Sequence, residues 1–247
     1  MDGTTEPVVA VIGHPIAGNP SQFAFERALA AMRLDWRVIS FDVAPEAISA
    51  ALDGAQVLGL RGILLDSNVS DAAALWCRQR QGEIDRIDCL YRDSDGQFLG
   101  CNQQRAWVDK KIVEHQESLG RDLSGCLWLG DQVDSSRIEA VLFSNPPIAT
   151  APQLDEIVAA DVVVIADVGG EPVTLEVDDW PPGKKSTLVV DLTDGHPDID
   201  RIQSLGYQVL TLEQRRIGTL RRCLKRWTGV DSSADVIHDA VEEYLAV

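Results

Sequence analysis

The chain has 247 residues, of which 22 are Lys or Arg and 39 are Asp or Glu, so its formal net charge is −17. Its 45% hydrophobic and 25% charged residues are ordinary for a globular protein of one or two domains. The acidity disfavours nucleic acid and anionic membrane surfaces as partners, because both need basic patches, and the sequence predicts no leader and no membrane span, hence a cytoplasmic protein.

The N-terminal part alternates between short apolar runs and amphipathic segments. The run 8–12 ends at Gly13 and predicts a buried strand followed by a loop, while Ser21 and Ser70 are predicted to cap helices. This alternation predicts a parallel sheet covered by helices. The predicted strands are 8–12, 37–43 and 62–65, and the predicted helices are 21–32, 45–52 and 70–80.

The pattern then changes to a hairpin, because runs 87–92 and 97–101 flank Asp95-Gly96, a strong turn signal. A long helix at 106–119 bridges to a second series of strands and helices. We therefore expect an α/β fold of two domains with a cleft between them. The second series comprises strands at 126–129, 141–143, 161–166, 186–192 and 208–211, helices at 135–140, 151–159, 197–205, 213–227 and 231–245, and a surface excursion at 169–185.

The five cysteines and four histidines show neither disulfide nor metal-ligand spacing. We expect buried free thiols and no metal site. The loose group Asp191, Asp194 and His196 allows a metal site but is more typical of a polar loop that follows a strand.

Six segments in chain order resemble the shikimate dehydrogenase family. They are Val11-Ile12-Gly13-His14-Pro15-Ile16-Ala17-Gly18-Asn19-Pro20-Ser21, Leu58-Gly59-Leu60-Arg61-Gly62, Asp95-Gly96-Gln97-Phe98-Leu99-Gly100-Cys101-Asn102, Ala160-Asp161-Val162-Val163-Val164, Leu188-Val189-Val190-Asp191-Leu192 and Arg226-Trp227-Thr228-Gly229. The resemblance implies an N-terminal α/β substrate domain at 1–103 plus 228–247 and a Rossmann-like, three-layer nucleotide domain at 104–227. It also implies hydride transfer between NADP and a cyclic hydroxy acid in aromatic amino acid biosynthesis, with a Lys-Asp pair assisting proton transfer.

The resemblance places uncharged residues where the family has this catalytic pair. Ser70 falls at the Lys position and Gln104 at the Asp position, and a hydroxyl and an amide cannot replace an acid and a base. We therefore expect no catalytic residue of the family type. The substrate-pocket positions carried over from the family are Asn19, Ser21, Asp66, Asp88, Asn102, Gln104 and Thr219, of which Asp66 and Asp88 replace neutral groups.

The cofactor side departs from the family in the same direction. Its glycine-rich turn is Gly130-Asp131-Gln132-Val133-Asp134 here, and the two acids would repel a phosphate at a helix N-terminus. Asn145 is not followed by the Arg that holds a 2′-phosphate in the family. Gly170 could contact a phosphate, although Gly169-Gly170 is more typical of a turn. We count Gly130, Asn145 and Gly170 as vestigial cofactor positions and expect no cofactor.

Three hypotheses follow for the function. The first is a shikimate dehydrogenase-like protein that has lost the chemistry and keeps a binding or regulatory role, with a small polar ligand in the interdomain cleft. The second is an active NADP-dependent oxidoreductase that acts on shikimate or a related small hydroxy acid through a rearranged site. The third is a protein-interaction scaffold. The chain is expected to be a monomer or a homodimer.

Overall fold

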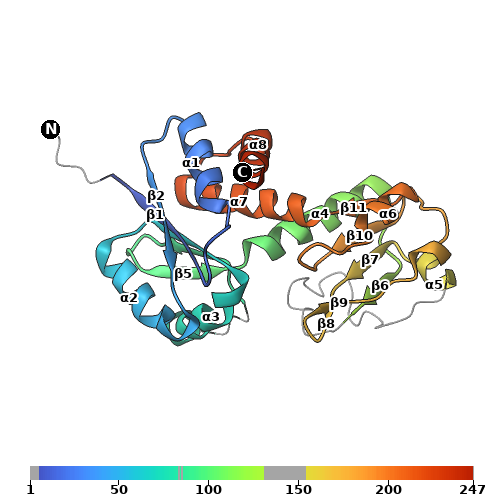
Figure 1. Cartoon of the computed structure of the whole chain (residues 1–247), viewed down its shortest axis with the longest axis horizontal. Coiled ribbons are helices and arrows are strands. Elements are labelled where there is room, and N and C mark those ends of the chain that lie inside the picture. Colours follow the sequence, from blue (N-terminus) through green and yellow to red (C-terminus); the bar gives the residue numbers. More distant parts are fainter. Residues whose placement is uncertain (1–5, 83, 85, 131–153, 247) are drawn as a thin grey trace. The chain divides into compact units, whose positions relative to one another are not determined.

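The computed structural model describes residues 6–82, 84, 86–130 and 154–246 (Figure 1). Contacts divide the chain into a first unit, residues 1–104 and 217–247, and a second unit, residues 105–216. Both units combine a sheet with helices, so the predicted two-domain α/β fold is confirmed. No helix in the described part of the chain is long and apolar enough to cross a bilayer.

The described sheet of the first unit has the strand order β2-β1-β3-β4-β5. Its first three strands are parallel, and the β4–β5 hairpin adds two antiparallel strands at one side. Residues of β1 are almost fully buried because helices cover both faces of this strand. The strands are β1 Val8–Gly13, β2 Arg37–Asp42, β3 Gly62–Leu65, β4 Cys89–Arg92 and β5 Phe98–Cys101.

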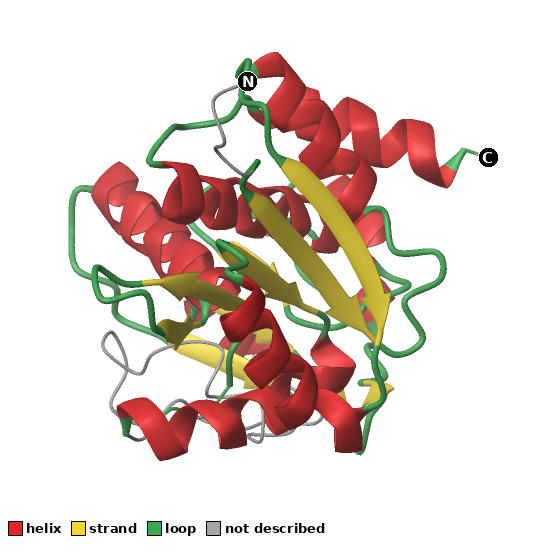
Figure 2. Ribbon diagram, turned by 90° about the vertical axis from the view of Figure 1, so that its left-hand side faces the viewer, coloured by secondary structure: helices red, strands yellow, loops and turns green. Residues whose placement is uncertain are grey.

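Two helical layers enclose this sheet (Figure 2). On one face α2 and α3 pack against β1 and β3, and on the other face lie α1, α8 and the C-terminal half of α7. As predicted, the last helix packs on the N-terminal domain, where Arg27 of α1 forms an ion pair with Glu243 of α8 at 2.7 Å. The helices are α1 Ser21–Ala31, η1 Pro45–Ala47, α2 Ile48–Leu58, α3 Ser67–Gln81, α7 Leu212–Thr228 and α8 Ala234–Leu245.

The boundary between the units falls inside α7. Leu220, Cys223 and Leu224 are buried in the core of the first unit, and Trp227 donates a hydrogen bond from Nε1 to the Leu90 carbonyl at 2.9 Å. Residues 217–227, which the sequence analysis placed in the nucleotide domain, therefore lie in the first unit.

The second unit has a parallel sheet of order β11-β10-β7-β6 among its described strands. The predicted helix 135–140 and strand 141–143 lie outside the described residues. The elements are α4 Gln103–Leu119, which starts in the first unit, β6 Cys126–Leu129, α5 Leu154–Ala159, β7 Val162–Ile165, β8 Asp167–Val168, β9 Glu171–Pro172, η3 Val177–Asp179, β10 Leu188–Asp191, α6 Ile199–Ser204 and β11 Gln208–Leu210.

The segment 169–185 is only partly the surface excursion that its Gly and Pro content predicts. Gly169 and Gly170 form the exposed tip of the β8–β9 hairpin, both with positive φ. The following apolar residues turn inward, and Val173, Val177 and Trp180 join the core of the second unit. The prediction was wrong for these residues, because the free energy gained by burying their apolar side chains outweighs the tendency of the neighbouring Gly and Pro residues to form surface turns.

The packing of Trp227 predicts a steric effect at Gly62. A Cβ added to Gly62 would overlap the indole ring of Trp227, so Gly62→Ala should lower the free energy of unfolding by about 1–3 kcal/mol in urea titrations. The control is Gly54→Ala in α2, where an added Cβ meets no atom within 4 Å and should raise helix stability by roughly 0.5–1 kcal/mol. Equal effects of the two changes would contradict this packing.

Candidate functional site

One edge of the first unit's sheet gathers most of the residues expected in the pocket. Strands β1, β2 and β3 end at this edge, the antiparallel β4 begins there, and β5 ends there. The polar residues beside these strand ends therefore lie along one line, although they are far apart in sequence. This carboxyl edge comprises the loop 14–20, Asp42, Asp66, Asp88 and Asn102.

Asn19 and Asp66 hold the loop after β1 against the start of α3. The Asn19 side chain donates from Nδ2 to Asp66 Oδ2 at 3.0 Å and accepts the backbone N–H of Ser21 at 2.9 Å. The other Asp66 oxygen accepts the backbone N–H of Ser67 at 2.6 Å, so Asp66 is the N-cap of α3. Ser21 is the buried first residue of α1 and not its cap, which corrects the prediction.

His14 and Asp42 form a contact that the sequence analysis missed. His14 Nδ1 lies 2.6 Å from Asp42 Oδ1, and both side chains are about half exposed, at 49% and 50%. The hydrogen bond from His14 lowers the pKa of Asp42. The Asn68 side chain also binds both the backbone N–H and the carbonyl of His14. In the sequence this pair could have been found only from its position. His14 directly follows one parallel strand, and Asp42 lies at the end of the next.

Ser70 lies in the first turns of α3 and is buried, with 2% of its surface exposed. Its hydroxyl donates to the Ile87 carbonyl at 2.6 Å and accepts the Ile87 N–H at 3.2 Å. The prediction that Ser70 caps a helix was wrong, because α3 begins three residues earlier, after Asp66. Ser70 instead satisfies the two polar groups of a buried backbone unit outside its own helix.

Asp88 lies at the N-terminus of α4. Its Oδ1 accepts the Gln103 N–H at 2.6 Å, and its Oδ2 accepts the Gln104 N–H at 2.7 Å. The first amides of a helix have no partner within the helix and carry its positive dipole end, so a carboxylate there is favourable. Burial nevertheless raises the pKa of Asp88 to about 6, while the two amide hydrogen bonds act in the opposite direction.

The remaining pocket positions of the first unit lie on or beside α4 and α7. Asn102 directly precedes α4, and Gln104 belongs to the first turn, where its amide is bound to Asp88. The intervening Gln103 is buried and accepts a hydrogen bond from Arg222 Nε at 3.0 Å, which links α4 to α7. Thr219 is a buried residue of α7, with 8% of its surface exposed. That these side chains face a cleft stays a prediction.

Of the three vestigial cofactor positions, Gly130 has a backbone conformation that favours glycine. It directly follows β6 with a φ of 113°, and an added Cβ would overlap the Ala166 carbonyl, so only glycine fits. Asp131, Asp134 and Asn145 lie outside the described residues. Gly170 is exposed at the tip of the β8–β9 hairpin. A Cβ added to Gly170 would meet no atom within 4 Å.

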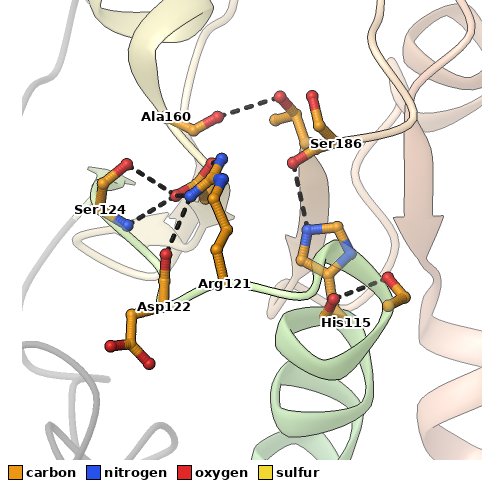
Figure 3. Close-up of polar contacts among 9 residues, drawn as sticks. His115, Arg121, Asp122, Ser124, Ala160 and Ser186 are labelled. Carbon is orange, nitrogen blue, oxygen red and sulfur yellow. Dashed lines mark hydrogen bonds and ion pairs between the residues drawn. The ribbon is translucent and has the colours of Figure 1, made fainter.

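An ion pair between Arg121 and Asp161 lies at the amino ends of β6 and β7, and Figure 3 shows the contacts of Arg121 and Ser124 there. Asp161, directly before β7, accepts two bonds from Arg121 at 2.9 and 2.6 Å and two from Ser124 at 2.6 and 2.9 Å. These contacts hold the pKa of Asp161 well below its usual value, with the Arg121 hydrogen bond as the largest cause. This network joins the amino ends of strands and is remote from Gly130 along β6, so its role is structural.

Comparisons with known proteins agree with this architecture. No family model matches the chain. A shikimate dehydrogenase (NADP(+)) of Methanothermobacter thermautotrophicus is 26% identical over 161 residues, 64% of this chain and 51% of that protein, so the chain spans about half of this relative. One of Natronomonas pharaonis is 28% identical over 206 residues, 72% of this chain and 74% of that protein.

Similar solved structures include shikimate dehydrogenases. Shikimate 5-dehydrogenase from Thermus thermophilus in complex with shikimate superposes with a TM-score of 0.72 at 18% identity, over 98% of this chain and all of that one. The chain is thus similar to shikimate dehydrogenases, at 26–28% identity to the two relatives above. This shikimate dehydrogenase-like chain shares their two-domain fold with its Rossmann-type unit, as the sequence analysis predicted.

The role of Ser70 can be measured through stability. Ser70→Ala removes both partners of the buried Ile87 backbone unit and should lower the free energy of unfolding by about 1–3 kcal/mol. Ser67→Ala, in the same helix turn but exposed, is the matched control and should change it by less than about 0.5 kcal/mol. A neutral Ser70→Ala would show that the hydroxyl is not needed for the fold.

The raised pKa of Asp88 predicts a pH dependence. Since its folded pKa of about 6 exceeds the usual pKa of 3.8, the unfolded chain ionises first, and the contribution of Asp88 to stability falls as pH rises through this window. The unfolding free energy of the wild type, relative to Asp88→Asn, should fall by at most about 3 kcal/mol between about pH 4 and about pH 6.5. A difference that grows in favour of the wild type would mean that the amide bonds outweigh burial.

Proposed function

We propose that this chain is a shikimate dehydrogenase-like protein without dehydrogenase activity, and that its role is binding or regulation. The observation that carries the proposal is the buried Ser70 hydroxyl, bonded on both sides to Ile87. Its position is the one where the family resemblance expects a catalytic Lys. The chain has no lysine before Lys110, so no ammonium group from the N-terminal segment can take that role.

The other half of the expected pair supports the same proposal. Gln104 has no acid–base function at neutral pH, and its backbone amide is bound by Asp88. Two acids at the carboxyl edge are themselves engaged, because Asp66 caps α3 and Asp88 caps α4, and the third, Asp42, is bound to His14. A general base must instead be within reach of a substrate proton and free to accept it.

The cofactor is proposed to be absent for an electrostatic reason. The residues after Gly130 include Asp131 and Asp134, which would offset the attraction of a helix N-terminus for phosphate, and a net charge of −17 adds long-range repulsion. Gly130 alone fits a nucleotide-binding turn.

A second candidate is an active NADP-dependent oxidoreductase. Gly130 supports it, because the first glycine of a dinucleotide-binding turn serves a tight turn, and Gly130 has a φ of 113° that favours glycine. The curated relatives are also named as NADP(+)-dependent shikimate dehydrogenases. This candidate needs an acid–base group other than Ser70 and Gln104.

Ligand titrations separate the two candidates. Calorimetric titration of the full chain with NADP and NAD at millimolar concentration should give no binding, and NADP-dependent oxidation of shikimate or quinate should be absent. A thermal-shift series with shikimate, quinate and dehydroshikimate tests for a remaining small ligand, since a ligand at 100 times its dissociation constant adds about 2.7 kcal/mol. Micromolar affinity for NADP would overturn the proposal and favour the active enzyme.

A double variant probes how much of the chemistry is missing. Ser70→Lys with Gln104→Asp restores the two side-chain types of the family's pair, but it leaves the acidic turn after Gly130 unchanged. No NADP-dependent turnover is therefore expected, and circular dichroism must show that the variant folds, because position 70 is buried. Turnover by this variant would show that the turn does bind the cofactor.

A further inference from the structure

His14 and Asp42 form a pair that is fixed from two sides. Asn68, in the first turn of α3, accepts the backbone N–H of His14 at 3.2 Å and donates to the His14 carbonyl. One oxygen of Asp42 accepts a hydrogen bond from the His14 ring, and the other accepts the backbone N–H of Ile16 at 3.4 Å. The ring and the carboxylate are therefore held in one geometry, although about half of each side chain is exposed.

The charge of Asp42 decides which nitrogen of His14 carries the proton. The hydrogen bond from His14 lowers the pKa of Asp42, so this group is a carboxylate at neutral pH and can only accept hydrogen bonds. His14 Nδ1, at 2.6 Å from the carboxylate, is therefore the nitrogen that is protonated in the neutral ring. The other nitrogen, Nε2, keeps its lone pair and is the basic atom of the pair.

Nε2 of His14 is available to water. Within the described ranges of the chain no hydrogen bond ends at this atom, and the His14 side chain is 49% exposed. The hydroxyl of Ser67, which precedes Asn68 in α3, donates to Asp66 at 3.2 Å and not to His14. The pair thus activates no side-chain nucleophile among the described residues, and water is the molecule from which Nε2 can take a proton.

The position and the charges around the pair limit its substrate. His14 and Asp42 lie at the carboxyl ends of β1 and β2, beyond which ligands of open α/β sheets bind. Asp66 follows the neighbouring strand β3, and the net charge of the chain is −17, so anionic substrates are repelled. A neutral ester is not repelled in this way, and its hydrolysis uses a general base and water but no cofactor.

We propose that His14 is the general base of a cofactor-independent hydrolysis of small neutral esters, and that Asp42 is its positioning residue. Nε2 takes a proton from a water molecule while the water oxygen attacks the acyl carbon. The bond between this carbon and the alcohol oxygen then breaks, and His14 returns the proton to the leaving alcohol. One ester and one water give one carboxylic acid and one alcohol, and His14 is restored. This activity goes beyond the binding or regulatory role proposed above and does not depend on NADP.

Hydrolysis of p-nitrophenyl acetate by the full chain tests the proposal. His14→Gln should lower the rate above buffer at least tenfold, because general acid–base catalysis typically contributes about 10²–10⁴-fold. The matched control is His238→Gln on α8, which should keep the wild-type rate. The remaining histidines, His115 and His196, are buried, with 3% and 4% of their surface exposed. Equal rates in the wild type and His14→Gln would overturn the proposal.

Two further rates separate the stated mechanism from other chemistry of an exposed histidine. The wild-type rate should fall in D₂O, because a proton leaves water as it attacks, and an unchanged rate would mean direct attack by Nε2. The anionic hemisuccinate ester of p-nitrophenol should be accelerated less over buffer than the acetate. Equal acceleration of the two esters would contradict the neutral substrate class.

The role of Asp42 is measured with Asp42→Asn. The amide of Asn can donate to Nδ1, which moves the ring proton to Nε2 and removes the base. The variant should show kcat lowered at least tenfold with KM unchanged, and nitrogen-15 NMR of His14 should show the proton on Nε2. Asp35→Asn, which removes an acid with an 80% exposed side chain just before β2, should change neither measurement. A wild-type tautomer and rate in Asp42→Asn would contradict this role.

Discussion

The Asp88 carboxylate at the N-terminus of α4 is the contact on which the first unit's carboxyl edge depends. It binds the first two amides of α4 and so joins the β4–β5 hairpin to the helix that leads out of the unit. The residue before it, Ile87, is fixed by Ser70 of α3. The side chains of Ser70 and Asp88 thereby connect α3 and the start of α4 to the backbone just before β4.

This arrangement turns potential site residues into structural ones. Asp66, Ser70 and Asp88 each bind backbone groups that helix ends or buried segments leave without partners. If such a side chain turned toward a ligand, its hydrogen bond to the backbone would break. The buried backbone group would then lack a partner, which costs about 1–3 kcal/mol. The exposed pair His14 and Asp42 is the part of the edge that is open to solvent.

The sequence predicted the architecture well because periodicity and turn signals are local. The alternation of strands and helices and the Asp95-Gly96 hairpin follow from neighbouring residues, whereas the packing of the last helix was predicted from the family resemblance. The interactions of the site could not be predicted in this way. Ser70 bonds to Ile87, and Asp88 bonds to Gln103, and both pairs are too far apart in the sequence for a short motif to reveal them. The helix cap at Asp66, not Ser70, and the assignment of residues 217–227 to the first unit likewise depend on tertiary packing.

Asp66, Ser70 and Asp88 hold the backbone at this edge and do not turn toward a substrate with a bound cofactor. Heteronuclear NMR of the full chain can follow the amide protons of Ile87, Gln103 and Gln104 while NADP and shikimate are added together. These three amides should exchange slowly with solvent and show no saturable shift with the cofactor. Rapid exchange of these amides in the free protein, or saturable shifts on addition of NADP and shikimate, would contradict it.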